Sequence, residues 1–263
     1  MQTPPPRPRD RVRTLSIAAP AYDEQDALPG FVATWAARLE AGGYDAAEVV
    51  VCDDGSRDGS GALLGRLAAE HPALRVVTHA TNRGAGAAMA SAIAATRHAW
   101  VLLVDADGQF PVGCLDALER VVEASGEGEL DAVLGARGAK RDTSFARAGS
   151  RLSNLACNTL LGSRLDDFSS TCRLVRGDLL RRLPLEARGL NYSLDVTARL
   201  LEAGARVVET PVPHDARGGG RSSRTAVRSS VDRALFVAWL GARRALARRG
   251  VLMGAGATAA RPR

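Results

Sequence analysis

The feature that most constrains the fold is a short apolar run that ends in two carboxylates. Residues 100–104 contain no polar side chain except the indole N–H of the tryptophan, as expected for a central strand that is covered on both faces. Asp105, Asp107 and Gln109 follow at alternate positions. In an extended segment alternate side chains point the same way, so these three are expected to converge. Their oxygens would suit Mg2+ or Mn2+, and a solvated turn is the alternative.

Strands and helices are expected to alternate four times within the first 105 residues, and each strand is followed by a polar loop. The expected elements are strands at 15–20, 48–52 and 100–104, helices at 26–41 (capped by Asp26) and 87–96, and a helix–strand unit at 60–78. This order predicts an α/β fold, a doubly wound and mostly parallel sheet with helices on both faces. Its ligand site is expected along the carboxyl ends of the strands.

Charge is unevenly distributed along the 263 residues. The net charge is +6, but the segment from Arg217 onward contains eleven arginines and a single carboxylate, Asp232, so the rest of the chain is mildly acidic. A basic tail on an acidic body predicts an anionic partner such as phosphate, anionic lipid or nucleic acid. The four cysteines lack metal-type spacing and are expected to be reduced, buried thiols.

Three of the expected strands end in polar groups where dinucleotide-binding folds carry glycines. These groups are residues 22–24, the pair Asp53 and Asp54, and the pair Asp105 and Asp107. Neither G-x-G-x-x-G after the first strand nor a Walker phosphate loop is present in the sequence. Carboxylates at these positions predict recognition of a nucleoside, with a metal ion handling its phosphates. Ordinary surface turns would have to occur at all three places to give the same pattern.

Four motifs, taken in order, resemble glycosyltransferase family 2 and its GT-A fold. They are Pro20-Ala-Tyr-Asp-Glu24, Val51-Cys-Asp-Asp-Gly-Ser-Arg-Asp-Gly59, Asn82-Arg-Gly-Ala-Gly-Ala-Ala88 and Asp105-Ala-Asp-Gly-Gln109. Within that family the chain is most similar to the dolichyl- and polyprenyl-phosphate sugar transferases, over about residues 15–224. The expected organisation is a disordered Pro/Arg-rich arm (1–13), a GT-A catalytic domain (14–224) and a basic amphipathic helix with a tail (225–263).

The resemblance implies roles for individual residues. The nucleotide pocket would contain Pro20, Tyr22, Glu24, Asp53 and Asp54; the metal ligands would be Asp105, Asp107 and Gln109, with Ala106 between the first two. Phosphate contacts would come from Arg137 and Arg151, and the loop 217–224, including Arg217 and Ser222, would close over the donor. Residues 167–173 are similar to the family's Asp-Pro-Thr-Ser-Gly-Phe-Arg, and Asp195 matches a further acidic position.

Three positions depart from the family pattern. Asp23 stands where Asn is usual, Ala85 stands where many members carry Lys, and Thr171-Cys172 replaces Gly-Phe. The second departure removes a cation on the phosphate side of the donor, and the third alters the expected floor of the acceptor pocket.

The implied reaction is a metal-dependent, inverting transfer of a hexose from GDP-mannose or UDP-glucose to a polyprenyl phosphate. A divalent ion and arginines would stabilise the negative charge that develops on the leaving diphosphate. A phosphate acceptor needs no general base, whereas a hydroxyl acceptor would need one. Asp167 and Asp195 are the candidates for that base, and each could instead cap a turn or helix. The alternatives are a soluble family 2 enzyme that acts on a hydroxyl and a non-catalytic nucleotide-sugar-binding protein.

The segment 231–249 predicts a basic helix with an aromatic-aliphatic face. Such a helix would suit an anionic membrane surface, and packing on the domain is the alternative. Longer similar proteins carry transmembrane helices after the catalytic domain, and no run here approaches that length. We therefore expect a cytoplasmic protein, peripheral on the inner face of the membrane, or one with a separate membrane-protein partner. Nucleic-acid binding is not expected, because no recognition motif or aromatic series accompanies the arginines.

Overall fold

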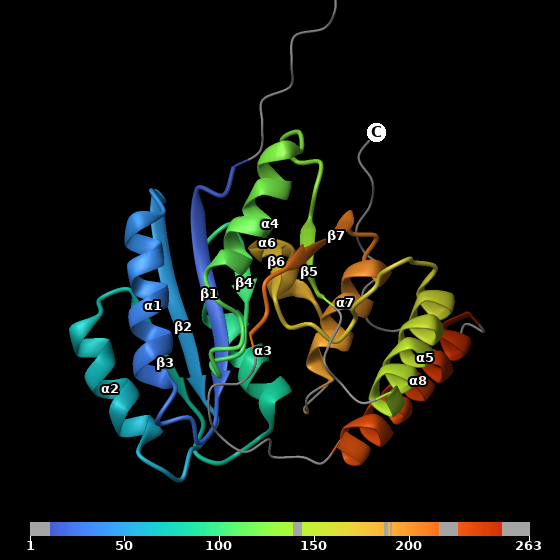
Figure 1. Ribbon diagram of the computed structural model, residues 1–263, viewed down its shortest axis with the longest axis horizontal. Helices are drawn as coiled ribbons and strands as arrows, with labels where there is room; N and C mark the ends of the chain where they lie inside the picture. Colours follow the sequence, from blue (N-terminus) through green and yellow to red (C-terminus); the bar gives the residue numbers. More distant parts are fainter. Residues whose placement is uncertain (1–10, 139–143, 187–188, 190, 216–225, 249–263) are drawn as a thin grey trace, which may run out of the picture.

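The computed structural model describes residues 11–138, 144–186, 189, 191–215 and 226–248. Its centre is a seven-stranded sheet in the order β3-β2-β1-β4-β6-β5-β7 (Figure 1). The strands are β1 (Thr14–Ala21), β2 (Ala46–Asp53), β3 (Leu74–Thr78), β4 (Trp100–Leu103), β5 (Ala132–Arg137), β6 (Arg173–Arg176) and β7 (Val207–Val212). The helices are α1 (Leu28–Ala41), α2 (Ser60–Glu70), α3 (Ala85–Ala95), α4 (Gly113–Ala124), α5 (Ser144–Leu161), α6 (Gly177–Arg182), α7 (Tyr192–Glu202) and α8 (Ala226–Arg248).

The sheet is mostly parallel, which confirms the predicted doubly wound α/β architecture. β1 pairs in parallel with β2 and β4, β2 with β3, and β5 with β7. Only β6 runs the other way, antiparallel to both β4 and β5. The amino end of β6 therefore lies at the edge where the parallel strands have their carboxyl ends.

Successive residues of the central strands bury their side chains on opposite faces of the sheet, as strand geometry requires. In β4, Trp100 and Leu102 pack in the core cluster with α1, α2 and α4, whereas Val101 and Leu103 pack in the cluster with α3, α6 and α7. All four are at most 1% exposed. Burial on both faces explains why this strand is an uninterrupted apolar run.

Two helix starts differ from the prediction. α1 begins at Leu28, and Ala27 rather than Asp26 occupies its N-cap, without a side-chain hydrogen bond. The backbone carbonyl of Glu24 instead accepts from the N–H groups of Ala27 and Leu28, each at 3.0 Å. α3 begins at Ala85, two residues earlier than expected, so the departure from the family pattern at this position lies in the first turn of a helix.

The end of the predicted N-terminal arm is packed against the domain. Val12 is 4% exposed and belongs to the first core cluster, and Arg13 forms an exposed ion pair with Asp45 at 3.5 Å. Residues 1–10 of the arm lie outside the described part of the chain.

Helix α8 lies beside α5 and packs on the domain through one of its faces (Figure 1). Leu240 is 1% exposed, and Phe236 and Val237 pack against the second core cluster. The Asn191 side chain at the start of α7 donates to the backbone carbonyl of Asp232, 2.9 Å away. In the part of the chain that the structure describes, no helix combines the length and hydrophobicity needed to cross a bilayer.

Replacing Leu240 with Ala should lower the free energy of unfolding by about 2–4 kcal/mol, because it opens a cavity where α8 meets the domain. Leu235, on the same helix, is 64% exposed, so Leu235→Ala should change stability by less than about 0.5 kcal/mol. Urea unfolding followed by circular dichroism measures both. Equal stability of the two variants would show that α8 does not pack on the domain in solution.

Candidate active site

Two loops at the carboxyl ends of β1 and β2 are joined by hydrogen bonds. The Asp23 carboxylate accepts from the N–H of Arg57 at 2.8 Å, and the Asp23 N–H donates to the Ser56 hydroxyl at 3.0 Å. The Glu24 N–H donates to the Ser60 hydroxyl at 3.0 Å. Asp23 has a positive φ of 53°, a conformation that Asn and Asp adopt more readily than most residues. This explains why Asp can stand here in place of the usual Asn.

The pocket residues predicted on these loops lie together. Pro20 is near the end of β1, in register with Cys52 of β2, and Tyr22 and Glu24 follow it as half-buried side chains. Asp53, at the end of β2, is 3% exposed and accepts from the Ser56 N–H at 3.0 Å. The structure thus brings these predicted nucleotide-pocket residues to one edge of the sheet, and their binding role stays a prediction.

Asp54 holds a third loop in place. Its carboxylate accepts from the N–H groups of Arg83 at 2.9 Å and Gly84 at 2.7 Å, and it pairs with His79 Nδ1 at 2.6 Å. Asp54 is 1% exposed. At Gly55 an added Cβ would lie 2.7 Å from the Thr81 backbone, so only glycine lets these loops approach. Asp54 is therefore a structural anchor of the loop that leads into α3.

Asp105 and Asp107 lie just beyond β4, on a turn. β4 ends at Leu103, and the chain turns at Ala106 and Asp107. The extended geometry expected for these residues is therefore wrong. Ala106 is 1% exposed, and the Gln109 N–H donates to Asp107 Oδ1 at 3.1 Å.

The two carboxylates nevertheless lie close enough to interact. Burial raises the pKa of Asp105, and the negative charge of Asp107 raises it further, whereas the nearby Arg137 guanidinium lowers it. A buried carboxylate whose ionisation is disfavoured by a neighbouring carboxylate forms a place where a cation is favoured. Within the described residues, no cluster of three or more His, Cys, Asp or Glu side chains could hold a metal ion. A cation here would need further ligands from the Gln109 amide or from a bound substrate.

The acidic pair has two partners that the sequence did not indicate. The Tyr192 hydroxyl, at the first residue of α7, donates to Asp105 Oδ1, and the Thr171 hydroxyl donates to Asp105 Oδ2 at 3.0 Å. Thr171 comes just before β6, whose antiparallel direction brings this segment to the strand-end edge. The available signal in the sequence was a tyrosine, Tyr192, three residues before the expected acidic position Asp195.

Arg137 and Asp167 form a two-pronged ion pair. Arg137 Nε and Nη2 donate to the two carboxylate oxygens of Asp167 at 2.7 and 2.9 Å. Asp167 also accepts from the N–H groups of Ser169 and Ser170 at 3.0 and 3.1 Å, which confirms that it caps the adjacent turn. Both members of the pair therefore have defined orientations.

Asp195 does not cap its helix, because Asn191 occupies the N-cap position of α7. It is 1% exposed, pairs with Arg199 Nε at 3.1 Å and accepts from the N–H of Glu186 at 2.6 Å. Its carboxylate is thus part of a buried ion pair that stabilises the α7 region.

Arg173, in β6, adds a buried cation near the ion pair of Arg137 and Asp167. It is 1% exposed and donates to the Thr197 hydroxyl at 3.0 Å and to the Phe168 carbonyl at 2.9 Å, and its Nη1 has no partner. Burial lowers the pKa of Arg173 to about 10. Arg151 lies exposed on α5, and the structure does not bring it into the hydrogen-bonded group around Asp105. Arg217 and Ser222 lie outside the described residues.

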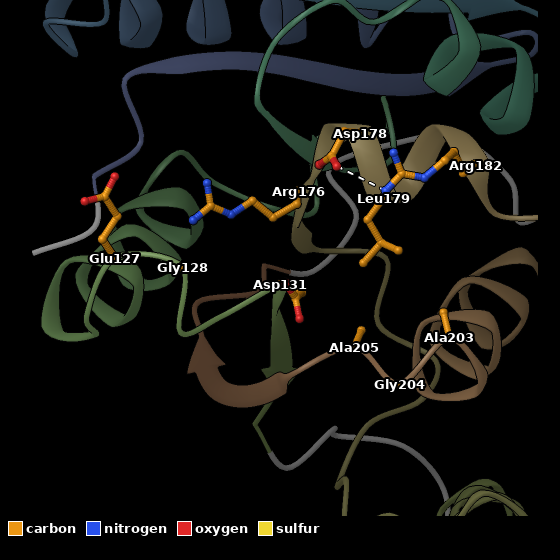
Figure 2. A pocket seen from close by; sticks show the side chains of 10 residues that line it. All are labelled: Glu127, Gly128, Asp131, Arg176, Asp178, Leu179, Arg182, Ala203, Gly204 and Ala205. Carbon is orange, nitrogen blue, oxygen red and sulfur yellow. Dashed lines mark hydrogen bonds and ion pairs between the residues drawn. The ribbon is translucent and has the colours of Figure 1, made fainter. Parts of the chain in front are cut away.

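A separate cavity of about 490 Å³ lies elsewhere (Figure 2). It is lined by Asp131 before β5, Arg176 at the end of the antiparallel β6 and the turn at Gly204, and Asp178 pairs with Arg182 at its rim. These positions mark the edge where the parallel strands begin. The cavity is therefore distinct from the group around Asp105.

The sequence is similar to a known family and to named relatives. The model of glycosyl transferase family 2 matches residues 16–184, more than half of the chain. The undecaprenyl-phosphate 4-deoxy-4-formamido-L-arabinose transferase of Pseudomonas aeruginosa is 33% identical over 217 residues, which cover 81% of this chain and 61% of the relative. That of Edwardsiella ictaluri is 30% identical, covering 80% and 63%. The chain thus matches less than two thirds of the length of these relatives.

Solved structures share the fold. Glucosyl-3-phosphoglycerate synthase of Mycobacterium tuberculosis, in complex with phosphoglyceric acid, matches with a TM-score of 0.63 and 21% identity, covering 91% of this chain and 81% of that one. Mannosyl-3-phosphoglycerate synthase of Rubrobacter xylanophilus matches with a TM-score of 0.59 and 19% identity, covering 94% and 78%.

The fold and the strand-end carboxylates define an α/β protein of the GT-A type. The chain belongs to glycosyl transferase family 2.

Asp54→Ala should lower the free energy of unfolding by about 2–4 kcal/mol, because it removes a buried acceptor from three donors. The amides of Arg83 and Gly84 should also exchange hydrogen faster, as measured by mass spectrometry. Asp45→Ala is the matched control, since its ion pair with Arg13 is exposed and of little expected value. If both variants were equally stable, the anchoring role of Asp54 would be refuted.

Proposed function

We propose that this protein is a glycosyltransferase that transfers a sugar from a nucleotide-sugar to the phosphate of a polyprenyl phosphate. The observation that supports the choice of acceptor is that the carboxylates of Asp167 and Asp195 are already engaged by other groups of the protein. Both are bound to an arginine and to backbone N–H groups. A carboxylate held in this way is poorly suited to take a proton from a substrate.

The engagement of both carboxylates favours an acceptor that needs no general base. The second pKa of a phosphate monoester is about 6, so its oxygen is already an anionic nucleophile at neutral pH. A hydroxyl acceptor would need a positioned base, which contributes about 100- to 10,000-fold to a rate. The names of the relatives, which are undecaprenyl-phosphate transferases, support the same acceptor class.

On the donor side, Pro20, Tyr22, Glu24 and Asp53 would hold the nucleoside, with Asp54 anchoring the adjoining loop. Asp105 and Asp107, with Gln109, would hold Mg2+ or Mn2+. Hard cations of this kind are often bound by one or two carboxylates together with substrate phosphates, which fits a site with two adjacent carboxylates. The bound ion would stabilise charge on the leaving diphosphate. A Mycobacterium tuberculosis neighbour was solved with Mn2+ and UDP.

Cations of the chain would neutralise the remaining charge. Arg137 lies near Asp105 and is oriented by Asp167 through Nε and Nη2, so we assign its Nη1 to a phosphate oxygen. Arg151 and Arg217 are proposed as further phosphate contacts, and Ser222 as part of the loop over the donor. Without a covalent enzyme nucleophile, the sugar would be transferred by a single displacement with inversion.

The identity of the sugar is a separate part of the proposal. A hexose from GDP-mannose or UDP-glucose follows from the sequence resemblance, whereas the relatives are named for 4-deoxy-4-formamido-L-arabinose, a pentose. Ala85, which replaces a lysine in the family pattern, lies in the first turn of α3 and removes one cation from the donor side.

The test is a donor and acceptor screen with purified full-length protein. The donors would be radiolabelled GDP-mannose, radiolabelled UDP-glucose and a radiolabelled nucleotide-linked 4-deoxy-4-formamido-L-arabinose. Each would be incubated with Mn2+ or Mg2+ and with undecaprenyl phosphate or a panel of soluble hydroxyl acceptors. We expect chelator-sensitive label in an acid-labile lipid from one donor. Label only in soluble acceptors would move the function to the hydroxyl-acceptor alternative, and an absence of any transfer despite donor binding would favour a non-catalytic binding protein.

Variants separate these outcomes further. Asp105→Asn should abolish transfer. Asp195→Asn should mainly reduce stability, and Asp167→Asn should raise the KM for the donor through Arg137, each with less than about tenfold change in kcat. A loss of kcat of about 100-fold or more in a stably folded Asp167→Asn or Asp195→Asn variant would identify a general base and contradict the phosphate acceptor.

We further propose that α5 and α8 form the surface by which the protein meets an anionic membrane. The large hydrophobic side chains of the described residues that are exposed all lie on these two helices: Leu152 (70%), Leu155 (63%), Val231 (52%), Leu235 (64%) and Trp239 (37%). The two helices lie side by side (Figure 1). Isolated exposed side chains are ordinary, but their concentration on one helix pair marks an interaction surface.

Charge favours a lipid surface as the partner. α5 contains two arginines and no carboxylate, and α8 contains five arginines and one carboxylate. Arg243 and Arg244 pair with Glu202 of α7, so they serve packing, as the sequence alternative stated. Basic residues near an anionic leaflet contribute about 1 kcal/mol each. The proposed location is the cytoplasmic face of the membrane, with a separate membrane protein as the alternative partner.

Flotation with liposomes tests this surface. Wild-type protein should bind vesicles that contain phosphatidylglycerol more tightly than vesicles of phosphatidylcholine alone, and salt should weaken the binding. Leu155→Asp combined with Leu235→Asp should weaken it about tenfold or more. Thr34→Asp, on the exposed face of α1, adds charge elsewhere and should have little effect. Failure of the wild type to float would refute the lipid surface and favour the separate membrane protein as the partner.

A further inference from the structure

The carboxylate of Asp105 is fixed by two hydroxyl groups that approach from different parts of the chain. The Tyr192 hydroxyl donates to Oδ1, and the Thr171 hydroxyl donates to Oδ2 at 3.0 Å. Each oxygen therefore has its own donor, and rotation of the carboxylate about its bond to Cβ would break both hydrogen bonds. Asp107, in contrast, accepts from a backbone N–H of its own turn.

Both hydroxyl groups are themselves held rigidly. Tyr192 is 4% exposed and packs in the second core cluster, and Thr171 is 8% exposed. Tyr192 starts α7, next to Asn191, whose side chain is bonded to the backbone of α8. Thr171 lies just before β6. The next residue, Cys172, fixes the backbone of this segment, because its carbonyl accepts from the Gly135 N–H at 2.8 Å.

We infer that Tyr192 and Thr171 are positioning residues that orient Asp105 for binding a divalent cation. The inference rests on the proposed metal role of Asp105. Carboxylates that bind metals are themselves usually hydrogen-bonded, and removing such a supporting partner costs about 10- to 100-fold in metal affinity. A hydroxyl can donate to one lone pair of each carboxylate oxygen and leave the other for the cation.

Thr171 departs from the family motif that this segment resembles. It stands at the position where the similar family motif has glycine, which has no side chain to donate. The motif difference predicts a change in the floor of the acceptor pocket, whereas in the structure the Thr171 hydroxyl donates to Asp105. Loss of this hydroxyl is therefore expected to weaken cation binding more than acceptor binding.

The experiment measures Mn2+ binding to the full chain by electron paramagnetic resonance of the free ion, with and without UDP. We expect Tyr192→Phe and Thr171→Val to weaken Mn2+ binding about 10- to 100-fold. Thr171→Ser keeps the hydroxyl and should stay within about threefold of wild type. Tyr44→Phe is the matched control, because it removes a hydroxyl that donates to Glu119 at 2.6 Å elsewhere in the domain.

The variant Asp105→Asn separates the metal role of Asp105 from the positioning role of Tyr192 and Thr171. If it binds Mn2+ as wild type does, the proposed metal role of Asp105 is wrong. If it loses Mn2+ while Tyr192→Phe and Thr171→Val bind normally, the metal role stands and the positioning role is refuted. Unfolding curves for each variant separate these effects from a loss of folding, since a purely structural role would lower stability in Tyr44→Phe and Tyr192→Phe without changing Mn2+ affinity in either.

Discussion

The direction of one short strand determines what lies at the functional edge of this protein. β6 is inserted antiparallel between β4 and β5, so the chain enters it at the edge where the parallel strands end. The preceding segment therefore carries Asp167, Thr171 and Cys172 to the carboxylates beyond β4. With a parallel β6 the same segment would lie at the opposite edge, near the cavity beside Asp131, and Asp105 would lose the Thr171 hydroxyl.

The functional edge carries charges of both signs. Burial and the charge of Asp107 disfavour ionisation of Asp105, but Arg137 lies near it and Arg173 is buried close by. The hydrogen bonds of Arg173 within the described chain go to a hydroxyl and a carbonyl rather than to a carboxylate. A buried guanidinium without a bonded carboxylate leaves positive potential in a medium of low polarity, where charges interact strongly. The site can therefore attract both a cation, at the aspartates, and phosphate groups, at the arginines.

The sequence predicted those parts of the molecule whose signals are local. Apolar runs followed by polar loops predicted β1, β2 and β4, because each strand is buried on both faces and ends at the same edge. The contact between Tyr192 and Asp105 joins residues 87 positions apart, and the direction of β6 depends on its neighbours. A four-residue strand that begins and ends with an arginine carries no signal of its own direction. The extended geometry expected for Asp107 is wrong for a local reason: the next residue, Gly108, has a positive φ of 74°, and the chain turns there, as in the turn alternative.

Contacts between distant residues also link the proposed metal site to the proposed membrane surface. One face of α8 packs on the domain through Leu240 and bonds to Asn191 at the start of α7, and the next residue of α7 is Tyr192, which holds Asp105. The other face carries the exposed Leu235. A helix that docks through one face and meets a membrane through the other would place the metal site at a fixed distance from the lipid headgroups. That arrangement suits a reaction in which a soluble donor must meet an acceptor phosphate that cannot leave the bilayer surface.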